Sequence, residues 1–88
     1  MKINAAKCST CRAAIYSRTR HDMRGCLCDR KESDTHIAID GGFDYIKMSL
    51  GSYAKYDMIE LEIDATKEML YEDWNHSIDK YGLIKDIQ

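Results

Sequence analysis

Four cysteines lie within the first 28 residues and constrain the fold more than any other feature of the chain. They form two close pairs, the first with two residues between its cysteines and the second with one. Two such pairs joined by a loop can aim four thiolates at one point, and Zn²⁺ takes four thiolates as a tetrahedron at about 2.3 Å. The sequence therefore predicts one structural zinc ion, with Cys8, Cys11, Cys26 and Cys28 as ligands.

Other interpretations of the cysteines stay open. Two disulfides would need an oxidising compartment, but the first seven residues contain no apolar signal-peptide core, so we expect reduced thiols in the cytoplasm. His21 or His36 could replace one cysteine as a ligand. A redox role for the first pair lacks the strand and helix that usually flank such motifs. Because four thiolates fill the coordination of zinc, we expect the metal to stabilise the fold rather than to react.

Length and charge describe a single small domain with two unlike parts. At 88 residues the chain falls in the size range in which a metal often supplements the core. Residues 1–31 hold eight Lys or Arg and two Asp, whereas residues 32–88 hold five basic and thirteen acidic residues. The two parts can neutralise each other in the folded protein or face two different partners. No stretch approaches the roughly 20 apolar residues of a membrane span.

Strands are predicted in two parts of the chain, just after the first cysteine pair and within residues 36–64, chiefly from the alternation of apolar and polar residues. Asp40, Gly41 and Gly42 form a turn signal between two β-type runs, which indicates a hairpin. The clearest one-sided strand has Ile59, Leu61 and Ile63 facing inward, with acidic residues between them. The predicted strands cover residues 13–17, 37–40, 43–50, and from Tyr53 or Tyr56 to 64.

One helix is predicted over residues 65–81. Leu70, Trp74 and Ile78 recur at four-residue intervals and form one apolar stripe with Met69 and Tyr81. Asp64 or Thr66 can cap its start, and Gly82 fits a left-handed residue after its end. The acidic face opposite comprises Glu68, Glu72, Asp73 and Asp79.

These elements predict an α+β fold. It contains a zinc-knuckled β-hairpin within residues 1–31, a small, mostly antiparallel sheet, and one C-terminal helix packed on that sheet. Residues 83–88 form a tail or an edge strand. We expect Trp74 to belong to the core rather than to anchor a partner.

Residues 7–47 resemble a family of short zinc-binding proteins that is common in bacteriophage genomes. The matching pieces are the two cysteine pairs, residues 17–22 with His21 and Asp22, and residues 37–46 with the glycine pair. This chain departs from the family pattern after Cys28, where residues 29–35 lengthen a connection that is usually short. The resemblance implies zinc binding and a viral origin, and it implies no particular activity. It also draws attention to His21 and Asp22, which could support the metal ligands. We expect instead a structural role for both, with Asp22 capping the loop.

Two functions follow, and neither is enzymatic, because the sequence holds no nucleophile–base motif or phosphate-binding glycine loop. A divalent ion between Asp40 and Asp44 is less favoured than a turn shaped by Asp40.

The first hypothesis is an accessory protein that binds a host or viral protein, for host takeover or against a host defence, through its acidic half. The alternative is nucleic-acid binding by the basic part, with Tyr16 stacking on a base. Its predicted contacts are Arg12, Arg18, Arg20, Arg24, Arg30 and Lys31.

Overall fold

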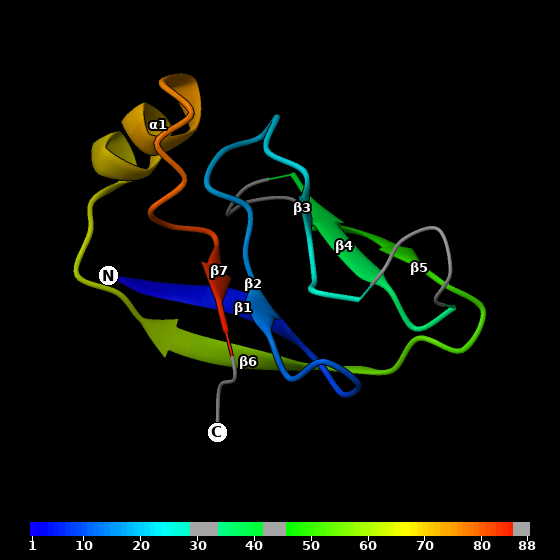
Figure 1. The fold of residues 1–88 in the computed structure, drawn as a ribbon. Coiled ribbons are helices and arrows are strands. Elements are labelled where there is room, and N and C mark those ends of the chain that lie inside the picture. Colours follow the sequence, from blue (N-terminus) through cyan, green and yellow to red (C-terminus); the bar gives the residue numbers. More distant parts are fainter. Residues whose placement is uncertain (29–33, 42–45, 86–88) are drawn as a thin grey trace.

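The computed structural model describes residues 1–28, 34–41 and 46–85, which form seven strands and one helix (Figure 1). In chain order the elements are β1 (Lys2–Cys8), β2 (Ala14–Ile15), β3 (Arg24–Gly25), β4 (Ile37–Asp40), β5 (Lys47–Leu50), β6 (Tyr56–Glu62), α1 (Lys67–Asn75) and β7 (Leu83–Ile84). The predicted α+β class, with small antiparallel sheets and one helix near the C-terminus, is confirmed. In the described part of the chain, no helix is long and apolar enough to cross a membrane.

The strands form two antiparallel sheets, one in the order β6-β1-β2-β7 and the other in the order β3-β4-β5. Strand β1, which sequence analysis did not predict, lies inside the larger sheet. It pairs with β6 along its full length, from Lys2 opposite Glu62 to Cys8 opposite Tyr56. This pairing ties the first cysteine to a strand almost fifty residues later in the chain.

The two faces of β1 belong to two different cores, because successive side chains of a strand point to opposite faces. Ile3 and Ala5 pack in one cluster with Leu70 of α1. Ala6 and Cys8 pack in the other, together with side chains of β4. The larger sheet therefore packs against the helix with one face and against the smaller sheet with the other.

Most of the predicted strands are confirmed. Strand β2 is a shorter form of the strand expected at 13–17, and β4 and β5 form the expected hairpin, with Asp40 opposite Lys47. Residues 42–45, which include the start of the predicted second strand, lie outside the described residues. In β6, Ile59 and Leu61 are half-buried, and Glu60 and Glu62, which alternate with them, are exposed, as predicted.

The helix is shorter than predicted. Thr66 caps it by accepting the backbone N–H of Met69 at 3.2 Å, but it ends at Asn75 rather than at residue 81. Ser77 and Asp79 then adopt left-handed conformations, with φ of 53° and 60°, and Ile78 is 61% exposed instead of packing on the sheet. Of the predicted apolar stripe only Leu70 is fully buried, and Trp74 is half-buried.

Asp73 explains why the helix stops. Sequence analysis placed this residue on the exposed acidic face, but its carboxylate is buried and accepts the backbone N–H groups of Lys80 and Tyr81 at 2.9 and 3.0 Å. These bonds satisfy amides that a longer helix would have paired internally, and they fold the chain back. Gly82 is left-handed with φ of 98°, as expected, but it precedes β7 and does not cap the helix. The predicted edge strand is present as β7, and residues 86–88 lie outside the described residues.

Candidate metal site

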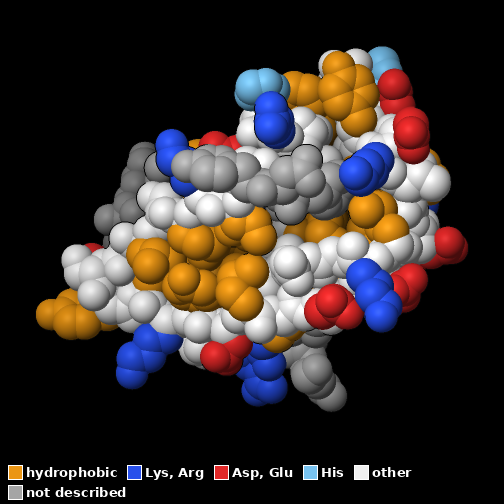
Figure 2. Space-filling model, turned by 180° about the vertical axis from the view of Figure 1, so that it is seen from behind, with side chains coloured by type: hydrophobic (Ala, Val, Ile, Leu, Met, Phe, Trp, Pro, Cys, Tyr) orange, Lys and Arg blue, Asp and Glu red, His pale blue; other side chains and the backbone are white. Residues whose placement is uncertain are grey.

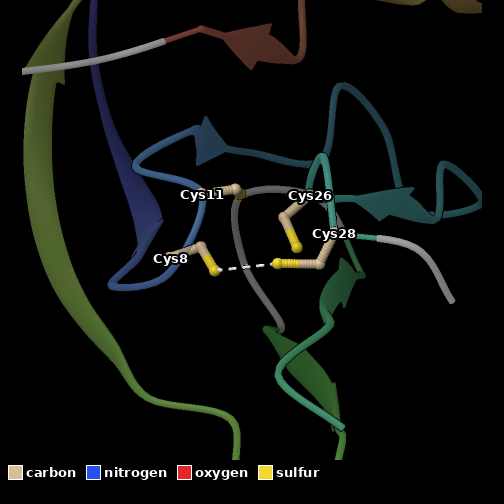
Figure 3. A group of neighbouring side chains, drawn as sticks. All are labelled: Cys8, Cys11, Cys26 and Cys28. Carbon is tan, nitrogen blue, oxygen red and sulfur yellow. Dashed lines mark hydrogen bonds between the residues drawn. The ribbon is translucent and has the colours of Figure 1, made fainter. Parts of the chain in front are cut away.

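The first cysteine pair lies in the tight turn between β1 and β2. Cys8 ends β1, and its carbonyl accepts the N–H of Arg12 at 2.9 Å, while its own N–H donates to Ala13 at 2.9 Å. Arg12 is left-handed with φ of 64°, and this conformation reverses the chain directly after Cys11. The turn therefore holds both sulfurs on the same side of the larger sheet's tip (Figure 3).

The second pair follows β3, in the smaller sheet. The N–H of Cys26 donates to the carbonyl of Ile37 at 3.0 Å, and the N–H of Ile37 donates to the Cys26 sulfur at 3.4 Å. Gly25, directly before this pair, does not have a positive φ. A Cβ at this position would lie 2.7 Å from Nε2 of His36, so a larger residue would require the His36 ring to move.

The four sulfurs converge at metal-binding distances. All four lie within 4.8 Å of one another, and those of Cys8 and Cys28 are 3.8 Å apart (Figure 3). A tetrahedron with metal–sulfur bonds of about 2.3 Å has sulfurs about 3.8 Å apart, whereas a disulfide needs about 2.05 Å. The cysteines are free, so the structure contains neither of the two disulfides weighed above. The prediction that these residues form one cluster able to hold a metal ion is confirmed.

Burial and hydrogen bonding give the thiols unequal acidity. Burial raises the pKa of Cys8, and it raises the pKa of Cys26 to about 12. Burial also opposes ionisation of Cys11, but backbone N–H groups of Ala13 and Leu27 outweigh it and lower its pKa to about 7. Cys11 is therefore ready to bind as thiolate, while Cys26 needs the positive charge of a metal to lose its proton.

Thr35 is a neighbour of the sulfurs that sequence analysis missed. Its hydroxyl donates to the Cys28 sulfur at 3.4 Å, and its carbonyl lies 3.8 Å from the sulfur of Cys8. Donors to bound thiolates fix their orientation and tune the metal. Only the position of Thr35, between the second pair and β4, could have suggested this role.

The residues expected to support the ligands have other partners. The N–H of His21 donates to the Thr19 hydroxyl, and its ring centroid lies 6.4 Å from that of Trp74. Asp22 is buried, and its carboxylate accepts the backbone N–H and the guanidinium of Arg18, so its role is structural, as expected, and it does not support the metal ligands. His36, weighed as a substitute ligand, is outside the cluster of four cysteines.

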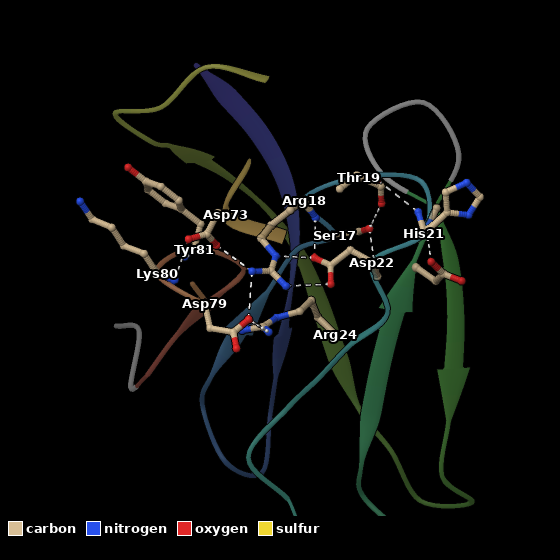
Figure 4. A network of polar contacts seen from close by, with 12 residues as sticks. Ser17, Arg18, Thr19, His21, Asp22, Arg24, Asp73, Asp79, Lys80 and Tyr81 are labelled. Atoms are coloured by element: carbon tan, nitrogen blue, oxygen red, sulfur yellow. Dashed lines mark hydrogen bonds and ion pairs between the residues drawn. The ribbon is translucent and has the colours of Figure 1, made fainter. Parts of the chain in front are cut away.

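Arg18 is the centre of a buried ionic network (Figure 4). Its guanidinium donates to Asp22 at 2.7 and 3.1 Å, to Asp73 at 2.7 Å and to Asp79 at 3.1 Å. Only 4% of Arg18 is exposed. The prediction that it contacts phosphates is therefore wrong, because its donors are already used inside the protein.

The other predicted nucleic-acid contacts that the structure describes differ in their exposure to solvent. Tyr16 is buried, which raises its pKa and prevents it from stacking on a base. Arg24 is half-buried and pairs with Asp79 at 3.4 Å. Arg12 and Arg20 are exposed, and Arg30 and Lys31 lie outside the described residues. Asp40 accepts the N–H of Gly41 at 2.8 Å and so shapes the turn, as expected, while Asp44 also lies outside the described part.

Comparison with known proteins adds a family but no activity. No curated protein and no solved structure matches the chain. A family model matches residues 1–50, which include both cysteine pairs and strands β1 to β5. The chain belongs to this family, a domain of unknown function (DUF7695).

Proposed function

We propose that the protein is a small, non-catalytic binding protein whose two sheets are joined by one structural Zn²⁺. The convergence of four free cysteines within 4.8 Å of one another carries this proposal. Soft thiolates in a tetrahedral set suit zinc, and four of them leave no position for a substrate. Cys8 and Cys11 would hold the ion from the larger sheet, and Cys26 and Cys28 from the smaller one.

The position of the cluster supports a structural role for the metal. Cys8 and Cys26 belong to the hydrophobic cluster between the two sheets, together with Ile15, Ile37 and Ile39. Structural zinc binds finger peptides with about 10–16 kcal/mol, and such binding energy stabilises the folded state. A metal here fixes the relative position of two sheets whose shared core is small.

The surface supports a protein partner. Residues 56–82 carry eight acidic residues and two lysines, a balance that favours association with a basic surface. Seen from behind, the molecule presents hydrophobic side chains in the middle of the face and charges of both signs around them (Figure 2). An apolar centre with a polar rim is typical of protein interfaces. The resemblance to bacteriophage proteins extends the proposal to a host or viral partner in the host cytoplasm.

Metal content tests the first half of the proposal. We expect about one zinc per chain in protein purified under reducing conditions, and a Cys28→Ser variant that loses it. Ser9→Ala, in the turn between Cys8 and Cys11, is the control and should keep its metal. A metal-free chain with fully protected amides, or thiols that prove to be paired covalently, would refute a zinc scaffold.

A pulldown from a bacterial host lysate tests the second half. The wild-type protein should recover a specific protein, and the Glu68→Lys/Glu72→Lys variant should fail to recover it. The matched variant Glu60→Lys/Glu62→Lys reverses two charges on β6. It should still recover the protein if α1 is required, and should lose it if the acidic surface as a whole is required. Titration with single-stranded DNA at low and raised salt tests the alternative. Binding that weakens steeply with salt would favour a nucleic-acid partner instead.

A further inference from the structure

A groove lies between α1 and the segment that folds back after it. Its volume is about 370 Å³, within the range of sites that hold small ligands or single side chains. One wall is formed by the helix and the other by the returning chain. The groove is lined by Glu68, Met69, Glu72, Asp73, Ile78, Lys80 and Tyr81.

The walls of the groove are fixed by buried hydrogen bonds. Asp73 accepts the backbone N–H groups of Lys80 and Tyr81, and its carboxylate is itself held by Arg18 at 2.7 Å. The N–H of Ile78 donates to the carbonyl of Asp73 at 3.0 Å. The returning chain is therefore attached to Asp73 of the helix at three backbone positions, Ile78, Lys80 and Tyr81. A ligand would meet a preformed site.

Two large apolar side chains face solvent across this groove. Met69 is 45% exposed on the helix, and Ile78 is 61% exposed on the returning chain. Ile78 is exposed because Ser77 and Asp79, its neighbours on both sides, are left-handed. Non-glycine residues rarely adopt this conformation, and such strain is concentrated at functional sites.

The charges around the groove indicate the chemistry of its occupant. Glu68 and Glu72 lie one turn apart on the helix wall, and Lys80 lies on the other wall. Glu72 also pairs with His76 at 2.7 Å. Arg18 neutralises the buried carboxylate of Asp73. The acidic groups that the helix wall presents to a ligand are therefore Glu68 and Glu72.

We propose that this groove binds an aliphatic or aromatic side chain of a partner protein, beside a Lys or Arg that contacts Glu68 and Glu72. The inference rests on the proposed protein-binding function and names the partner's chemistry. Burial of the apolar side chain against Met69 and Ile78 would supply affinity, and the basic neighbour would supply direction and specificity.

The test measures binding of short fluorescein-labelled peptides to the zinc-loaded full chain. One peptide contains Leu and Lys, and its control has the same sequence with each Lys replaced by Glu. The Lys peptide should bind, and the Met69→Ser/Ile78→Ser variant should bind it about tenfold more weakly. Met58→Ser/Leu50→Ser is the matched control, because Met58 and Leu50 are 47% and 49% exposed outside the groove. Methyl NMR should show shifts at Met69 and Ile78 on titration.

Several results would overturn the groove as the binding site. They are an absence of binding, equal binding to the Lys and Glu peptides, undiminished binding by Met69→Ser/Ile78→Ser, and methyl shifts confined to Met58 and Leu50. A wild-type dimer in light scattering that Ile78→Ser dissociates would assign the groove to a second copy and would also overturn the proposal. None of these results removes the protein-binding function itself, which fails if the lysate pulldown recovers no specific partner or if the DNA titration shows a nucleic-acid partner instead.

Discussion

The guanidinium of Arg18 donates to the carboxylate of Asp73 at 2.7 Å, although 55 residues separate them in the chain. Both side chains are almost completely buried, at 4% and 3% exposure. The pair joins the loop after β2 to the helix, and Asp73 in turn holds the chain that follows the helix. One ion pair therefore connects three segments and forms one side of the groove.

Asp73→Asn should destabilise the protein by about 3 kcal/mol. Removing one partner of a buried ion pair leaves the other charge insufficiently compensated, which typically costs about 3–5 kcal/mol. We expect the low end because Asp22 still accepts two hydrogen bonds from Arg18. Urea unfolding of the zinc-loaded protein measures the change. Glu72→Gln, at an exposed position in the same helix, is the control, and an equal loss in both variants would contradict a special role for Asp73.

The stability contributed by Asp73 should disappear in acid. Burial opposes ionisation of this carboxyl, but hydrogen bonds from Arg18 and from the N–H groups of Tyr81 and Lys80 outweigh it and hold its pKa below the usual 3.8. The unfolded chain therefore takes up the proton first as the pH falls. The free-energy difference between wild type and Asp73→Asn should be constant near neutrality and shrink below about pH 4. A difference that grows in acid would mean that Asp73 is neutral in the folded protein.

Removal of the metal should loosen the smaller sheet more than the larger one. Strand β1 pairs with β6 over seven residues and buries Ile3 and Ala5 in a core that it shares with the helix. We expect Cys26→Ser to speed amide exchange in β3, β4 and the turn at Cys11. Exchange in β6 and in the part of β1 before Cys8 should stay slow, because the pairing of these strands and the core around Ile3 and Ala5 lie away from the cysteines. Uniformly fast exchange would instead show that the whole domain depends on zinc.

The cysteine cluster could be predicted because its determinants are local. Each pair lies on one short turn, so the spacing alone indicates where its two sulfurs point. The hairpin at Gly41 and the alternation in β6 are local for the same reason. The family match over residues 1–50 covers the cysteine pairs and the hairpin but not β6.

The features that sequence analysis missed depend on distant contacts. Strand β1 is mostly Ala, Lys and Asn, which predict no strand, and it is ordered by pairing with β6. The helix pattern continued to residue 81, but Asp73 binds the backbone at Lys80 and Tyr81 and ends the helix early. Arg18 belongs to a basic run that is typical of a phosphate-binding surface, and nothing local shows that its partner is Asp73. Burial of a charge is decided by the fold and not by neighbouring residues.

Arg12→Gly should strengthen metal binding and raise stability slightly. Arg12 adopts φ of 64° directly after Cys11, a conformation that costs an L-residue about 1–2 kcal/mol and costs glycine almost nothing. Glycine also makes the unfolded chain more flexible, which removes about 0.4–1 kcal/mol of the gain. We therefore expect a net stabilisation of about 0.5–1 kcal/mol and tighter zinc binding in competition with a chelator. Arg12→Ala is the control, because alanine loses the same side chain and keeps the backbone strain. If both variants weaken zinc binding equally, contacts of the Arg12 side chain matter more to this turn than its backbone conformation.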